Sequence, residues 1–132
     1  MILPKNPEKF LKNFLKVSPS QAFLLTGGDE KVEKLLVRSL SGGGESFLDL
    51  RVYEGEALKI EEAREIHLAA HQSALSGSKI FLIKTDYIAP EAQGTLLKIL
   101  EEPYPQTYFV ISLSSEALLL PPLLSRLTIF RA

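Results

Sequence analysis

Three short segments of this chain are almost entirely apolar, and helical sequence separates them. Residues 22–25 read AFLL, residues 79–83 read KIFLI, and residues 109–111 read FVI. A strand that is apolar on both of its faces belongs in a sheet covered on both sides, which is typical of parallel sheets joined by helical crossovers. The alternation therefore predicts an α/β fold with a parallel sheet between two layers of helices.

Turn residues and apolar spacing place the remaining elements. Pro7 is expected at the first position of a helix, and Pro103 disfavours helical geometry in the residue before it. We expect strands over residues 22–25, 50–53, 79–83, 107–112 and 127–130. We expect helices from Asn6 as the N-cap, over residues 29–40, 60–74 and 90–102, and from Glu116.

The most specific pattern lies in the second half of the chain. Residues 96–103 read LLKILEEP, and Ser125-Arg126 follows the fourth expected strand. Together they resemble the LLK-x-LEEP and SRC signatures of the AAA+ clamp-loader subunits of bacterial DNA polymerase III, the gamma and delta-prime class. The resemblance implies a three-layer, P-loop NTPase-like (AAA+, RecA-like) core. It also implies a five-stranded parallel sheet in the order 5-1-4-3-2.

The resemblance also implies how the chain is organised. Residues 1–132 are expected to form a single AAA+ core domain. The helical lid and the C-terminal collar domains of the family are expected to lie outside this chain. A fragment of a longer subunit and a reduced relative are both compatible with this. The four-cysteine zinc module of the family is not expected, because the sequence has no cysteine.

The phosphate-binding motif of the family is not preserved. A P-loop reads G-x-x-x-x-G-K-[ST], so that backbone N–H groups and a lysine contact the phosphates. The first expected strand runs into Gly27 and Gly28, but Val32 stands at the position of the last glycine. Asp29 and Glu30 lie at the start of the next helix, where their charge repels a triphosphate. The degenerate P-loop at Gly27 and Gly28 predicts that no nucleotide cofactor binds.

The Walker B strand of the family is altered as well. Its terminal carboxylates hold Mg²⁺ in an active site. Counting back from the LLK motif, the Asp-Glu pair of the family falls on Ile83 and Lys84, which cannot bind Mg²⁺. Asp86 is interpreted as a turn or helix-capping residue. Leu113 and Ser114 replace the residues that sense the terminal phosphate. We therefore expect no bound metal ion and no ATPase activity.

One arginine of the family is retained. In the family, the SRC arginine reaches into the nucleotide site of a neighbouring subunit and stabilises charge on the transferring phosphoryl group. Ser125 and Arg126 keep this pair, with Leu127 in place of the cysteine. The resemblance implies that Arg126, with Ser125, is a candidate arginine finger that acts in trans. The plainer alternative is a surface arginine that caps a short helix.

Two further patterns carry weaker signals. His67 and His71 are spaced as zinc ligands are on a helix, but no third ligand is apparent. The net charge of −1 gives no overall basic footprint for nucleic-acid binding. Phosphate contact is nevertheless an alternative to a solvated face for four lysines that recur along the first helix: Lys5, Lys9, Lys12 and Lys16.

These observations predict a non-catalytic clamp-loader subunit, closest to delta-prime, in DNA replication. Its expected partners are gamma/tau-type ATPase and delta-type subunits, and through them the sliding clamp and primed DNA. The longest apolar run, residues 118–124, contains two prolines, so no membrane span is expected and a cytoplasmic location follows. The alternatives are a generic protein-interaction domain with this fold and an active ATPase.

Overall fold

The computed structural model describes residues 1–18, 20–27, 30–41, 48–72 and 78–131. The described chain alternates between helices and strands from end to end. In order, the elements are α1 (Pro7–Val17), β1 (Ala22–Thr26), α2 (Glu30–Leu40), β2 (Leu48–Leu58), α3 (Ile60–Ala70), β3 (Ser78–Ile88), α4 (Pro90–Glu101), β4 (Thr107–Leu113), the 3₁₀ helix η1 (Glu116–Leu118), α5 (Pro121–Leu124) and β5 (Thr128–Arg131).

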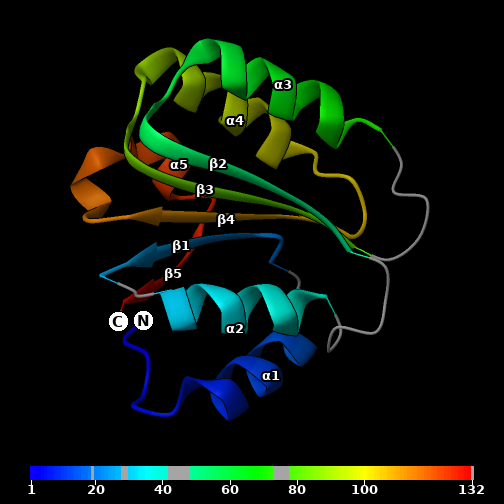
Figure 1. Cartoon of the computed structure of the whole chain (residues 1–132), viewed down its shortest axis with the longest axis vertical. Coiled ribbons are helices and arrows are strands. Elements are labelled where there is room, and N and C mark those ends of the chain that lie inside the picture. The colour runs from blue at the N-terminus through cyan, green and yellow to red at the C-terminus, as the bar shows by residue number, and fades with distance from the viewer. Residues whose placement is uncertain (19, 28–29, 42–47, 73–77, 132) are drawn as a thin grey trace.

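The strands form one five-stranded sheet in the order β2-β3-β4-β1-β5. Every neighbouring pair is parallel. Helices α3 and α4 cover one face of this sheet, and α2 with α1 covers the other (Figure 1). The expected three-layer α/β fold and the strand order 5-1-4-3-2 are both confirmed.

Two apolar cores, one on each face, explain the continuous apolar strands. Phe81 and Ile83 of β3 pack into the core beneath α3 and α4. Ile80 and Leu82, which alternate with them, pack into the core against α1 and α2. Because successive side chains of a strand point to opposite faces, a strand between two cores must be apolar at nearly every position.

Helix α3 ends earlier than expected. It stops at Ala70, whereas apolar spacing predicted a helix to residue 74, and residues 73–77 lie outside the described residues. Lys79, at the start of β3, is 2% exposed, and its ammonium donates to Ala69 O at 2.7 Å and to Gln72 O at 2.5 Å. A cation that binds the last carbonyls of a helix satisfies their hydrogen bonds and complements the helix dipole. Burial lowers the pKa of Lys79.

Helix α1 begins with Pro7 as predicted, but not through the expected cap. The Asn6 side chain makes no capping hydrogen bond, so the fixed backbone of Pro7 is what starts the helix. The chain before it runs along the free edge of β5. Ile2 bridges to Arg131 in parallel, and the Met1 ammonium donates to Ile129 O at 3.0 Å. The N-terminus and the C-terminal strand therefore lie side by side (Figure 1).

Strands β2 and β3 are each 11 residues long, well beyond the predicted 50–53 and 79–83. They pair from Leu48 with Ser78 to Leu58 with Ile88. The interpretation of Asp86 as a turn or capping residue was wrong, because it is an exposed residue within β3. Gly55, in the extension of β2, has φ 150°, a backbone conformation that residues other than glycine rarely adopt.

Candidate functional site

The region of the altered phosphate-binding loop lies at the carboxyl end of β1. Gly27 directly follows β1 and has φ 67°, the left-handed conformation that favours glycine. Gly28 and Asp29, the rest of the candidate loop, lie outside the described residues. Helix α2 begins at Glu30, so its first turn faces the same edge of the sheet as the end of β3.

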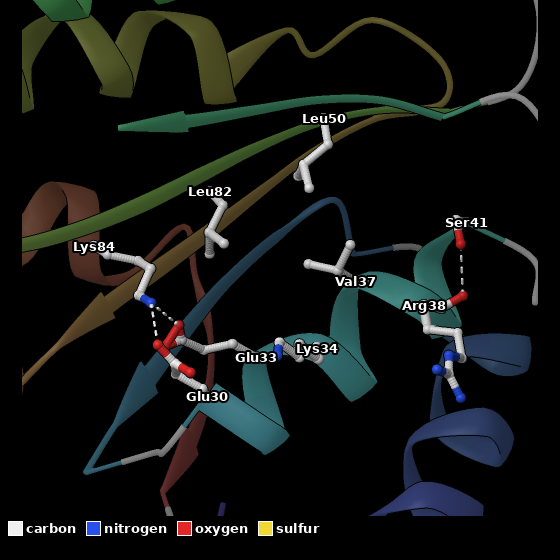
Figure 2. Close-up of a pocket in the computed structure, with 9 residues that line it drawn as sticks. All are labelled: Glu30, Glu33, Lys34, Val37, Arg38, Ser41, Leu50, Leu82 and Lys84. Atoms are coloured by element: carbon white, nitrogen blue, oxygen red, sulfur yellow. Dashed lines mark hydrogen bonds and ion pairs between the residues drawn. The ribbon is translucent and has the colours of Figure 1, made fainter. Parts of the chain in front are cut away.

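A cluster of opposite charges lies at this edge. The Lys84 ammonium of β3 is 3.3 Å from Glu33 Oε2 and 3.8 Å from Glu30 Oε1, both on α2. On its other side it lies 3.6 Å from Glu54 Oε2 of β2, the residue paired with Lys84 across the two strands. Figure 2 shows Lys84 extending from β3 toward Glu30 and Glu33. We call these four residues the Lys84 cluster.

The pair of Lys84 and Glu33 dominates the cluster. The side chain of Glu33 is only 6% exposed and that of Lys84 21%, whereas Glu30 and Glu54 are 74% and 67% exposed. Water screens the charges of the two exposed carboxylates, so they add little. Glu33 Oε2 has no hydrogen bond of good geometry, and at 3.3 Å we treat its contact with Lys84 as an ion pair with partial hydrogen-bond character.

The cluster shifts the titration of Lys84. The pKa of its ammonium is raised above the ordinary 10.5. Hydrogen bonding to Glu33 is the largest cause, burial opposes it, and the charges of Glu33, Glu54 and Glu30 reinforce it. Lys84 is therefore a cation over the whole neutral range, held by the carboxylate of α2.

The cluster reverses the charges of a nucleotide site. In a P-loop ATPase the loop and its helix supply a lysine to the phosphates, and the strand opposite supplies the carboxylate for Mg²⁺. Here the helix supplies Glu30 and Glu33, and the strand supplies Lys84. Ile83, the other residue at the Walker B position, is fully buried in the core beneath α3 and α4. These residues do not fit Mg²⁺-ATP, because carboxylates would face the phosphates and an ammonium would face the metal.

A groove of about 460 Å³ continues from the cluster along α2. Its apolar wall consists of Val37, Leu50 and Leu82, and Arg38 and Ser41 lie at the far end (Figure 2). On this face of β2, no helix of the described residues covers Leu50, and its side chain is exposed. The groove contains no nucleophile paired with a base, so the described residues give it no catalytic constellation of that kind.

Arg126 lies away from the Lys84 cluster, at the other end of β1. It follows α5, whose C-cap is Ser125, and its N–H donates to Leu123 O. Thr128 pairs with Phe23 near the start of β1, so the residues before Thr128 lie toward the amino end of the sheet. The Arg126 side chain is exposed and forms no ion pair with any carboxylate in the described parts of the chain. Arg131, by contrast, is paired with Glu116 at 2.5 Å.

A buried glutamine connects the segment that bears Arg126 to the rest of the fold. Gln93 of α4 is 4% exposed, and its amide nitrogen donates to Ile88 O at 2.9 Å and Leu118 O at 3.2 Å. Its amide oxygen accepts from the N–H of Leu120, the N-cap of α5, at 2.8 Å. Gln93 thus fixes the end of β3, η1 and the start of α5 to one another.

The remaining candidates are separate from both places. The rings of His67 and His71 are in contact, with centroids 4.3 Å apart and planes tilted by 39°, and His71 Nδ1 lies 2.7 Å from His67 O. Within the described ranges, no group of three or more His, Cys, Asp or Glu could hold a metal ion, and no helix is long and apolar enough to cross a membrane. At the end of β4, Leu113 is buried and Ser114 is exposed.

Sequence reasoning missed Glu33 and Gln93. Glu33 lies on the buried face of α2, one turn before Leu36 and Val37. A carboxylate at an apolar helical position, together with a lysine at the end of an apolar strand, is the signal that could have predicted the ion pair. No comparable signal marks Gln93, because its partners are backbone atoms of distant segments.

The comparisons with known proteins agree on one family. The family described as "DNA polymerase III, delta subunit" matches residues 41–132. A curated relative, the DNA polymerase III subunit delta' of Haemophilus influenzae, is 30% identical over 82 residues. That match covers 61% of this chain and 25% of the relative, so the chain spans about a quarter of the length of this relative.

A solved structure shows the same fold. It is the crystal structure of a DNA polymerase III, gamma subunit-related protein from Thermotoga maritima, with a TM-score of 0.75 and 21% sequence identity. The match covers 95% of this chain and 45% of that one. At this identity the likeness supports the fold and does not extend to the chemistry.

Proposed function

Because this chain belongs to the DNA polymerase III delta-subunit family of clamp-loader subunits, we propose that it is a non-catalytic, delta-prime-like subunit. In this proposal the domain formed by residues 1–132 docks against a gamma/tau-type ATPase subunit and a delta-type subunit. It supports the loading of the sliding clamp on primed DNA, and Arg126 with Ser125 contributes to the ATP site of a neighbour.

The observation that carries the proposal is the ion pair of Lys84 and Glu33. It lies between α2, the first helix after β1, and Lys84 of β3, at the Walker B position, where an ATPase of this fold has its phosphates and Mg²⁺. Forming an ATP site there would require breaking a partly buried ion pair and would leave the buried carboxylate of Glu33 without its counter-charge, at a cost of about 1 to 3 kcal/mol. The fold therefore remains while its own nucleotide chemistry is lost.

The position of Arg126 supports action on another subunit. It lies toward the amino end of β1, whereas Gly27 follows the carboxyl end of the same strand. Its side chain is exposed and unpaired in the described parts of the chain, so no internal contact would have to break before it reached a neighbour. An arginine finger needs this freedom, because it must contact a phosphoryl group held by another chain.

Reconstitution tests the proposal. The subunit is combined with a gamma-type ATPase subunit and its partners, and DNA-stimulated ATP hydrolysis is measured for wild type and Arg126→Ala. Arginine fingers contribute roughly 10³- to 10⁵-fold at one site in GTPases, and a ring with several sites will show a smaller total loss. We expect association to be retained and hydrolysis to fall. The matched control is Arg64→Ala, an exposed arginine of α3.

Each result separates the candidates. Failure of wild type to associate with gamma-type subunits would favour a generic interaction domain. Association with unchanged hydrolysis in Arg126→Ala would reduce Arg126 to a surface residue that follows a short helix. Hydrolysis by this subunit alone would identify it as an ATPase.

A further inference from the structure

The outward face of α1 gathers cations that the proposed function does not use. Lys9, Lys12 and Lys16 are all exposed, and their spacing of three and four residues places them on one side of the helix. A hollow of about 260 Å³ on this side is lined by these three lysines together with Asn6, Glu8 and Asn13.

A second hollow extends the same face to the neighbouring helix. It has a volume of about 590 Å³, shares Lys12 and Lys16 with the first, and reaches Arg38 and Ser39 of α2. We call the two hollows together the lysine surface. It is defined by Lys9, Lys12, Lys16 and Arg38, with the polar residues Asn6, Asn13 and Ser39 among them.

The charge of the lysine surface is opposite to that of the chain. Its lining residues include four cations and one carboxylate, Glu8, whereas the whole chain carries −1. Glu8 lies 3.7 Å from Lys12, and both side chains are largely exposed. An exposed pair of this kind contributes at most about 1 kcal/mol, so Lys12 remains available to a stronger anion.

The arrangement of these cations favours a linear polyanion over a membrane. From Lys9 to Lys16 the helix rises about 10 Å, so the three lysines form a line rather than a compact pocket. A helix that lies in a membrane surface needs an apolar face for the lipid. Here that face is already used, because Phe10 and Phe14 pack against Phe130 of β5.

We propose that the lysine surface binds the sugar–phosphate backbone of nucleic acid without reading its sequence. Lysine and arginine supply charge to the phosphates, and the amides of Asn6 and Asn13 and the hydroxyl of Ser39 can donate hydrogen bonds to phosphate oxygens. No aromatic side chain lines either hollow to stack on a base. The inference is independent of Arg126 and of the nucleotide site, because they lie on other elements.

The test measures the binding of a short fluorescent DNA duplex of mixed sequence to the 132-residue chain by anisotropy. We expect a dissociation constant of about 10⁻⁴ to 10⁻⁶ M at low salt. Four phosphate contacts give a slope of log K against log salt of about −3.6. Lys12→Glu with Lys16→Glu should weaken binding at least about tenfold and reduce that slope by about 2.

The matched control is Arg64→Glu with Lys98→Glu, which makes the same change in net charge on exposed residues of α3 and α4. It should stay within about twofold of wild type, since it leaves the phosphate contacts intact. Equal weakening of both double variants would reduce the effect to net charge and overturn the proposal. So would an absence of salt-dependent DNA binding by wild type, or binding to vesicles of anionic phospholipid but not to DNA. Thermal unfolding of each variant shows whether it is folded.

Discussion

Lys84 of β3 and Glu33 of α2 lie 3.3 Å apart, with the carboxylate almost completely buried. The helix that carries a phosphate-binding lysine in an ATPase therefore carries the carboxylate of Glu33 here. The neighbouring strand carries the ammonium of Lys84. Lys84 and Glu33 attract each other at the place where, in an ATPase, the lysine would bind the triphosphate and the carboxylate would bind the metal ion. The site is thus closed by its own side chains.

Replacing Lys84 should destabilise the fold, because the buried carboxylate of Glu33 then has no counter-charge. Lys84→Met leaves Glu33 buried without its counter-charge, and we expect a loss of about 1 to 3 kcal/mol in the free energy of unfolding, measured in urea. The control is Lys31→Met, an exposed lysine of α2, which should stay within about 0.5 kcal/mol. Adding Glu33→Leu to Lys84→Met should restore most of the loss, because the double variant buries no lone charge. Equal stability of Lys84→Met and wild type would contradict a stabilising pair.

The same pair predicts a dependence on alkaline pH. The folded-state pKa of Lys84 is raised above the unfolded value of 10.5. Its contribution is therefore fully present below pH 10.5 and is lost as the pH rises through the folded pKa. The difference in unfolding free energy between wild type and Lys84→Met should be constant from neutral pH to about 10 and should shrink above it. If this difference in unfolding free energy instead grew at high pH, folding would lower the pKa of Lys84 rather than raise it.

Lys79 should stabilise the C-terminal end of α3. Lys79→Met removes the donor to Ala69 O and Gln72 O, and we expect a loss of about 1 to 3 kcal/mol in unfolding free energy. In Lys79→Met, amide hydrogens should exchange faster in the last turn of α3 than in α4. Lys98→Met, an exposed position on α4, is the control and should change little. Unaltered exchange in that last turn would show that the helix end does not depend on this ammonium.

The sequence predicted the fold better than the lengths and ends of its elements. Apolar strands between helices were sufficient for a parallel sheet, because few other arrangements bury a strand such as residues 79–83 on both faces. The extension of β2 and β3 could not be predicted, since residues such as Glu54 and Tyr87 are held by pairing between strands rather than by an apolar face. At the end of α3, Lys79 donates to Ala69 O and Gln72 O, and no local sequence pattern marks this contact between segments.

The candidate site was predictable in part for a similar reason. Motif comparison placed Lys84 where a carboxylate is needed, and that placement required only counting along the chain. The partner of Lys84 depends on how α2 is rotated about its axis, which brings Glu33 to the sheet. The three hydrogen bonds of Gln93 depend on backbone atoms of β3, η1 and α5, and only tertiary structure brings those together.

Gln93 should affect the segment of Arg126 without contacting any partner. Gln93→Leu leaves Leu120 N–H and two carbonyls without their partner, and we expect a loss of about 2 to 4 kcal/mol in unfolding free energy. Gln93→Glu keeps an acceptor for Leu120 N–H but points a buried carboxylate at two carbonyl oxygens, so its loss should be at least as large. In the reconstituted complex, Gln93→Glu should lower ATP hydrolysis toward the level of Arg126→Ala while association is retained. Hydrolysis at the wild-type rate in a folded Gln93→Glu complex would show that Gln93 has a structural role only.

Nucleotides should not stabilise this chain. A ligand that binds only the folded state at 100 times its dissociation constant adds about 2.7 kcal/mol. Each kcal/mol raises the melting temperature of a domain of this size by roughly 2 to 8 °C. ATP or ADP with Mg²⁺ at about 1 mM would therefore produce a clear thermal shift if either bound with a dissociation constant of about 10 μM. We expect no such shift, because Glu30 and Glu33 face the phosphate position and Lys84 faces the metal position.

Lys84→Ala with Glu33→Gln should not create nucleotide binding either, since Val32 and the residues after it still provide no Gly-Lys-Thr. A calorimetric titration of wild type that gave a micromolar dissociation constant would show instead that the Lys84 cluster opens to admit a nucleotide.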